Sequence, residues 1–133
     1  MSELVRIEAR SASLGNGLEV RRALPTRQQR MVGAWCFLDH AGPVEFAPGA
    51  GMHVGAHPHI GLQTFTWLIE GEVLHRDSLG SEQLLRPGQV NLMTAGHGIA
   101  HSEEAQTLGV HAAQLWIALP DSHRHIAPRF QHY

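Results

Sequence analysis

The sequence HPHIGLQTFTWLIEGEVLHRD, residues 57–77, carries the pattern that decides the fold class of this chain. Its central run, residues 64–69, is rich in the β-branched and aromatic residues that strands favour. A turn signal, Glu70-Gly71, separates this run from a second, alternating one. The stretch therefore predicts two short strands, at 62–69 and 72–78, joined as a hairpin.

The rest of the chain repeats this pattern of short apolar or alternating runs, which Gly or Pro interrupts every 8–12 residues or so. No stretch of a dozen residues has a helical period, and residues 120–127 are expected to form one short turn. Ten strands would have to hide their edges by closing into a barrel or by packing as two sheets. We therefore expect an all-β jelly roll or small barrel whose interior holds one small ligand. Strands are expected near 4–9, 18–24, 33–39, 51–56, 62–69, 72–78, 83–85, 89–94, 98–103 and 111–119, with further turns at 77–81 and 86–89.

Composition limits the class of protein. The chain has 133 residues, of which 43% are hydrophobic and 17% charged, as expected for one globular domain. A net charge of −2 without a basic run argues against direct contact with nucleic acid or an anionic membrane. No signal peptide and no apolar run of membrane-spanning length are recognisable, so a cytoplasmic location is expected. Cys36, the single cysteine, is expected to be a buried, inert thiol.

Two segments carry side chains that bind metals, at the same spacing. The first reads His57-Pro58-His59, and the second reads His101-Ser102-Glu103. Alternate residues of a strand face the same side, about 6–7 Å apart, so each segment directs two ligands to one place. Pro58 favours extended backbone and would stiffen the first pair before metal binds. Three imidazoles and one carboxylate would suit a divalent transition metal and leave coordination positions open.

Other histidines compete for these roles, because the chain contains eleven. His53 has the same parity as His57 but lies about 13 Å away by strand rise, so it is expected at the rim or surface. His97 could form a hydrogen bond behind His101 or lie in a solvated loop. His75 would face the same side as Asp77, and the two read as a surface pair.

Three further residues are candidates for contact with the metal or its ligand. Gln63 follows the first motif and could approach the metal weakly, bind one of its ligands or face solvent. Met93 and Trp67 belong to a set of strand-borne apolar residues that would either fill the barrel or line a dry pocket above the metal. The other members of that set are Trp35, Trp116, Phe37, Phe65 and Leu92.

Four stretches together resemble the pirin family of the cupin superfamily. Residues 57–64 are similar to the first metal motif of that family, and residues 66–80 to the hairpin that follows it. Residues 87–103 are similar to the second metal motif, and residues 114–120 to the strand that closes the domain. The resemblance extends over roughly residues 30–131 and implies a cupin fold, a double-stranded β-helix.

By motif position, the resemblance implies that His57, His59, His101 and Glu103 hold the metal. It favours Fe(II), and the donor set would also accept Ni, Mn, Cu, Co or Zn. The chain departs from the family pattern at two positions, because many members have Glu where Gln63 stands and Arg often takes the place of His97.

Typical pirins have two cupin domains, of which the first binds metal. The resemblance therefore implies that residues 1–133 form a single cupin domain equivalent to the N-terminal one, with no second cupin, as either a natural single-cupin member or the N-terminal domain of a two-cupin pirin. The surface that the second domain would cover is then expected to be apolar and bare, which would favour a homodimer.

The family resemblance implies two kinds of function. One is that of a quercetin 2,3-dioxygenase, which opens a flavonol or similar enol with O₂. A metal with open positions would accept the two oxygens of the enolate and lower the pKa of its hydroxyl, and Glu103 would serve both as a ligand and as the base. The other is that of an iron-binding regulator that docks a partner protein. A third alternative, apart from these two, is a cupin that acts on another small molecule.

Overall fold

The computed structural model describes residues 3–14 and 18–133, which form eleven β-strands and no helix. Every predicted strand except the one at 4–9 overlaps an observed strand, so the all-β class is confirmed. The strands in chain order are β1 (Arg10–Ser13), β2 (Glu19–Leu24), β3 (Trp35–Glu45), β4 (His53–His59), β5 (Leu62–Glu70), β6 (Val73–Asp77), β7 (Glu82–Leu85), β8 (Val90–Thr94), β9 (Ile99–Ala105), β10 (Gly109–Ala118) and β11 (Arg129–His132).

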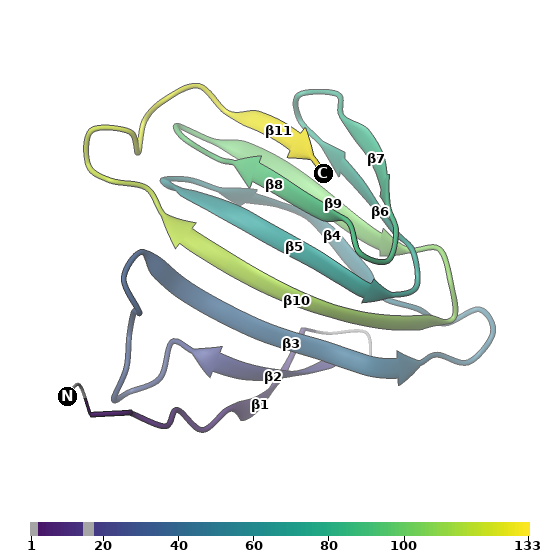
Figure 1. Cartoon of the computed structure of the whole chain (residues 1–133). Helices are drawn as coiled ribbons and strands as arrows, with labels where there is room; N and C mark the ends of the chain where they lie inside the picture. Colours follow the sequence, from purple (N-terminus) through teal and green to yellow (C-terminus); the bar gives the residue numbers. More distant parts are fainter. Residues whose placement is uncertain (1–2, 15–17) are drawn as a thin grey trace.

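The strands form two antiparallel sheets that lie one behind the other (Figure 1). The larger sheet has the order β1-β2-β3-β10-β5-β8-β11, and the smaller has the order β4-β9-β6-β7. The chain passes from one sheet to the other between β3 and β4, β4 and β5, β5 and β6, β7 and β8, β8 and β9, and β9 and β10. This repeated crossing is the jelly-roll topology that the strand pattern predicts.

The predicted hairpin at Glu70-Gly71 is wrong, because β5 and β6 belong to different sheets. Gly71 has a φ of +91°, and a Cβ on it would lie 2.1 Å from the carbonyl oxygen of Gly109. The glycine is therefore needed for the chain to cross tightly from one sheet to the other. The next turn signal, residues 77–81, does connect a hairpin, formed by β6 and β7.

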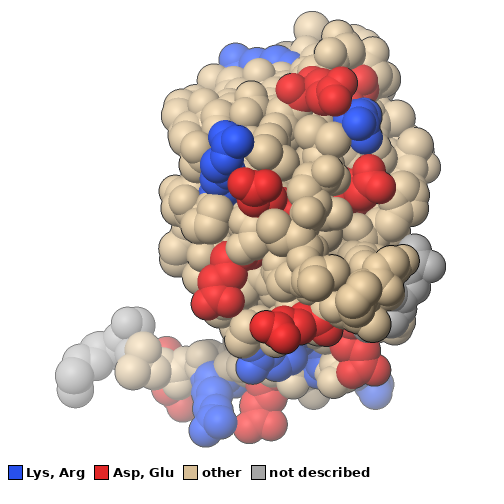
Figure 2. All heavy atoms as spheres, turned by 90° about the vertical axis from the view of Figure 1, so that its right-hand side faces the viewer, with Lys and Arg blue, Asp and Glu red and all other residues tan. Residues whose placement is uncertain are grey.

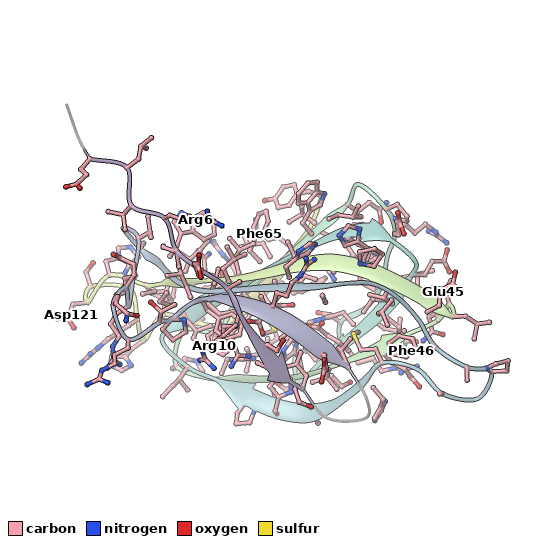
Figure 3. The ribbon with its side chains drawn as sticks, turned by 90° about the horizontal axis from the view of Figure 1, so that it is seen from below. Arg6, Arg10, Glu45, Phe46, Phe65 and Asp121 are labelled. Carbon is pink, nitrogen blue, oxygen red and sulfur yellow. The ribbon has the colours of Figure 1, made fainter. Side chains whose placement is uncertain are left out.

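The two ends of the described chain also differ from the prediction. Residues 4–9 form no strand, and Leu4 and Val5 are 98% and 74% exposed, so they bury no apolar surface against a sheet. The sequence pattern missed β11, which pairs with β8 at the edge of the larger sheet. Residues 120–127 form turns without a helix, as expected, and Asp121 lies at the opposite end of the long strands from Glu45 (Figure 3).

Apolar side chains from both sheets fill the space between them. Leu68 from the larger sheet and Leu85 from the smaller are fully buried in one cluster, and Met93 and Ile99 form a second cluster with Phe130. A cavity remains between the sheets, and it contains the site described below.

The outer surface carries mixed charge and a thiol of low reactivity. Acidic and basic side chains are interspersed on the face shown in Figure 2. Cys36 is half-buried, and burial raises the pKa of its thiol. A helix with the length and hydrophobicity of a membrane crossing is absent from residues 3–14 and 18–133.

Candidate metal centre

Pairing of β4 with β9 brings the two predicted motifs together. In this antiparallel pair His57 lies opposite His101, and His59 lies opposite Ile99. Since alternate residues share a face, His57, His59 and His101 all project from the smaller sheet into the cavity. The register shifts between Val54 and His57, so the strand does not continue regularly from the metal motif toward His53.

The ring nitrogens of these three histidines converge. The Nε2 atom of His101 lies 3.1 Å from Nε2 of His57 and 3.2 Å from Nε2 of His59. One nitrogen from each ring lies within 4.8 Å of the other two. A transition metal bound at about 2.1 Å by ligands at right angles needs donors about 3 Å apart. The two separations from His101 therefore fit neighbouring ligands of a single ion.

Hydrogen bonding and burial leave these nitrogens ready to bind a cation. The Nδ1 atom of His57 lies 2.7 Å from the carbonyl oxygen of Gly55. Because a carbonyl only accepts, Nδ1 carries the hydrogen and Nε2 keeps its lone pair. Burial, and after it the neighbouring imidazoles, lower the pKa of His101 to about 3 and that of His59 to about 4. Both rings are therefore neutral at pH 7.

Glu103 lies beside this cluster. It lines the same cavity, its side chain is 14% exposed, and Oε1 is 3.6 Å from Nδ1 of His101. Burial raises the pKa of the carboxyl to about 7. Among the described residues, the group of mutually close donors consists of the three histidines, and the Glu103 carboxylate is not part of it.

The opposite wall of the cavity comes from the larger sheet. The cavity has a volume of about 130 Å³ and is mainly apolar. Its polar side chains on this wall have partners: Asp39 accepts at both carboxylate oxygens from Arg22, which lies outside the lining, at 2.7 Å, and Thr66 donates to Gln114 at 3.0 Å. The cavity thus has a metal-binding wall and a facing wall of paired polar groups.

Aromatic rings support the site from the larger sheet. Trp116 stacks on Phe37 with ring centroids 3.9 Å apart and an interplanar angle of 12°. The same indole meets the His59 ring edge-on at 5.2 Å. Arg22 lies over the ring of Phe37, with its guanidinium carbon 4.7 Å from the ring centroid. These contacts restrict the orientation of His59 and keep this end of the cavity apolar.

The structure places the four other predicted site residues elsewhere. Gln63 donates to the hydroxyl of Thr94 at 2.9 Å, and Met93 is buried in the second apolar cluster. His97 is exposed in the turn before β9, and Trp67 is 45% exposed on the outer side of the larger sheet. None of the four is among the described residues that line the cavity.

The sequence interpretation misjudged one histidine pair. His53 has a 60% exposed side chain 3.9 Å from Glu104, as expected of a surface residue. The prediction that His75 and Asp77 form a surface pair is wrong, because their side chains are 3% and 0% exposed. In the register of β6 with β9, His75 lies opposite Glu103 and Asp77 opposite His101. The available signal was the spacing of two in His75-Arg76-Asp77, which matches that of the metal motifs.

Comparison with known proteins agrees with this fold. A model of the Pirin family matches residues 17–117. A Pseudomonas aeruginosa protein named "Putative quercetin 2,3-dioxygenase" is 67% identical over 132 residues, which are 98% of this chain and 42% of that protein. A crystal structure of quercetin 2,3-dioxygenase from Acinetobacter baumannii has a TM-score of 0.92 at 66% identity, covering 95% of this chain and 43% of that one.

A metal complex is known among the solved structures. The bacterial pirin YhhW from Escherichia coli, solved in complex with nickel(II), has a TM-score of 0.79 at 26% identity, covering 94% of this chain and 54% of that one. This chain spans less than half the length of the curated relatives that it matches. The matches confirm the cupin fold that the sequence motifs imply. The chain belongs to the pirin family.

Proposed function

We propose that this chain holds one divalent transition metal, iron in the first place, with His57, His59, His101 and Glu103. The observation that carries the proposal is the convergence of three imidazole nitrogens in an enclosed cavity. Neutral nitrogen donors with a carboxylate suit iron, nickel and similar ions, and the relative YhhW was solved with nickel(II). Glu103 lines the same cavity beside His101 and is the proposed fourth ligand.

The substrate that we propose is a flavonol or a similar chelating enol, which reacts with O₂. The names of the Pseudomonas and Acinetobacter relatives support this class. When bound, a divalent ion of this kind supplies adjacent positions for two enolate oxygens and lowers the pKa of the substrate hydroxyl. The apolar side chains around the cavity exclude water from the reacting anion.

Glu103 is the proposed base. Its carboxylate takes the proton of the substrate hydroxyl, which leaves the enolate oxygen negative. A base works best when its pKa lies near the working pH, and burial brings the pKa of this carboxyl to about 7 in the metal-free chain, so Glu103 is proposed to act as the base when its carboxylate has loosened from the metal. His101 and His59 do not compete for the proton, because their pKa values are much lower.

Gln114 and Thr66 are proposed to position the far side of the substrate. They face the metal-binding wall from β10 and β5, and Thr66 donates to the side-chain oxygen of Gln114. This contact orients the amide group and directs its N–H atoms away from Thr66. A substrate oxygen could then accept a hydrogen bond from Gln114 while the enol end meets the metal-binding wall.

The test is a direct assay of the chain loaded with Fe(II). We expect loss of flavonol absorbance together with O₂ uptake, and neither with a His101→Ala variant loaded in the same way. Glu103→Gln is expected to reduce turnover strongly and to remove the pH dependence that a base near pH 7 produces. If the metal-saturated chain shows no turnover with any of several enols, the dioxygenase proposal fails.

A second candidate is an iron-binding regulator that docks a partner or a second copy of itself, and one surface favours it. On the outer side of the larger sheet, Phe65 lies opposite Leu92 and Leu115 in register, and Trp67 is 45% exposed beside them. Exposed apolar surface of this kind marks interaction sites. A homodimer that dissociates on Trp67→Arg, measured by sedimentation, would support this candidate.

A further inference from the structure

We propose that His75 and Asp77 are positioning residues of the metal centre: they hold His101 in the tautomer that presents Nε2 to the metal. This inference rests on the proposed metal site, and it concerns two residues that do not themselves reach the three converging nitrogens. The relevant contacts form a chain from the turn between β6 and β7, through β6, to β9.

Asp77 begins the chain and is fixed by the turn that follows it. Its Oδ1 accepts from the backbone N–H groups of Leu79 at 2.9 Å and Ser81 at 3.1 Å. Its Oδ2 lies 2.7 Å from Nε2 of His75. An ionised carboxylate has no hydrogen to donate, so Nε2 of His75 must carry the hydrogen in this contact.

The direction of the hydrogen bond between His75 and Asp77 determines which atom donates in the contact between His75 and His101. With its hydrogen on Nε2, the neutral His75 ring has a lone pair on Nδ1. That atom lies 3.4 Å from Nδ1 of His101, which therefore acts as the donor. Nε2 of His101 is left without a hydrogen, and this is the atom that lies 3.1 Å and 3.2 Å from the corresponding atoms of His57 and His59.

The surroundings hold both rings in place. The side chains of His75 and Asp77 are 3% and 0% exposed, so water does not replace either hydrogen bond. Phe130 of β11 stacks on the imidazole ring of His75, with ring centroids 4.2 Å apart and an interplanar angle of 14°. Glu103 is the competing acceptor for His101, and its Oε1 lies 3.6 Å from Nδ1 of His101, farther than Nδ1 of His75 at 3.4 Å. Partners in this outer position typically change metal affinity by about 10- to 100-fold.

The most informative variant is Asp77→Asn. It keeps the shape of the side chain but makes residue 77 the donor, instead of the acceptor, in the hydrogen bond with His75. The asparagine oxygen continues to accept from Leu79 and Ser81, so its NH₂ group faces His75. His75 must then accept at Nε2 and carry its hydrogen on Nδ1, opposite the donor of His101. We expect Co(II) affinity to fall by about 10- to 100-fold and the visible spectrum of the bound Co(II) to change. His75→Phe, which keeps the stacking on Phe130, is expected to act similarly.

The matched control is Glu82→Gln on β7, which removes the same charge from a side chain that is 64% exposed. It should leave the affinity and the spectrum unchanged. Nitrogen NMR of the metal-free wild type supplies a readout that needs neither metal nor variant: His101 should carry its hydrogen on Nδ1 and His75 on Nε2. The opposite tautomer of His101, or a folded Asp77→Asn variant with wild-type Co(II) affinity, would overturn the proposal. Failure of the wild type to bind Co(II) would instead refute the metal site while the NMR result still reports on the tautomer.

Discussion

The two walls of the cavity differ in how their polar groups are satisfied. On the larger sheet, the polar groups bind one another, Arg22 with Asp39 and Thr66 with Gln114. On the smaller sheet, the Nε2 atoms of His57 and His59 converge on Nε2 of His101 at 3.1 Å and 3.2 Å, and Nε2 of His57 keeps its lone pair because its Nδ1 donates to the carbonyl oxygen of Gly55. The smaller sheet therefore keeps an arrangement of ring nitrogens that a bound cation would stabilise. One wall is thus complete in itself, and the other is built for a ligand.

The largest effect should come from removing a donor of the metal-binding wall. We expect His101→Ala to lower metal affinity by more than the approximately 100-fold that loss of an outer partner can cause, because His101 is close to both other nitrogens. Competition with a chelator of known affinity measures this change. The control is His53→Ala on the same pair of strands, whose 60% exposed side chain should be dispensable for binding. Wild-type affinity in His101→Ala would remove the basis for the comparison of the two walls.

Breaking the paired wall should affect folding much more than metal binding. Arg22→Ala leaves the buried Asp39 carboxylate without its cation, and Asp39 is 2% exposed. The loss of one partner of a buried pair costs about 3–5 kcal/mol of unfolding free energy. Urea unfolding of the metal-free chain measures this, with Arg76→Ala as control, because the exposed ion pairs of Arg76 should contribute about 0–1 kcal/mol.

The stability of the metal-free chain should depend on pH through His101 and Glu103, whose pKa values are shifted in opposite directions. The folded pKa of His101 is depressed, so its contribution is present above about pH 6.5 and is lost as the pH falls toward 3. The folded pKa of Glu103 is raised, so its contribution has the opposite sign and is lost as the pH rises through 7. Metal-free Glu103→Gln should therefore be more stable than the wild type at pH 8, by on the order of 2–3 kcal/mol, and more sensitive to acid. If Glu103→Gln changed the unfolding free energy by the same amount at pH 8 and at pH 5, this assignment would be contradicted.

A smaller effect concerns the protons released when the metal binds. At pH 6 the Glu103 carboxyl, with a pKa of about 7, is about nine-tenths protonated before binding, whereas His101 and His59 are already neutral. We expect Glu103 to contribute close to one proton per metal at pH 6 and close to none at pH 8, measured by calorimetry in buffers of different ionisation enthalpy. Glu103→Gln should remove this contribution at pH 6 if the carboxyl is the fourth ligand.

The sequence predictions were correct where they depend on spacing within one strand and wrong where they depend on which strands lie together. The convergence of His57, His59 and His101 was predictable because a spacing of two directs side chains to one face of any strand. The placement of β5 and β6 was not, because Glu70-Gly71 signals a tight turn without indicating which sheet receives the next strand. The same uncertainty made His75 read as a surface residue, since its burial depends on which face of β6 is turned to the larger sheet, where Phe130 of β11 stacks on its ring.

By itself, the sequence determined the all-β class, the family and the side chains that can bind a metal, because local periodicity and motif spacing are properties of neighbouring residues. Only the tertiary structure decided that β4 pairs with β9 in a register that brings the imidazoles within 3.1–3.2 Å of His101. It also decided that a third strand places His75 and Asp77 behind that histidine. Pairing between strands depends on contacts between residues far apart in the chain, and burial by both sheets sets which of those contacts are protected from water.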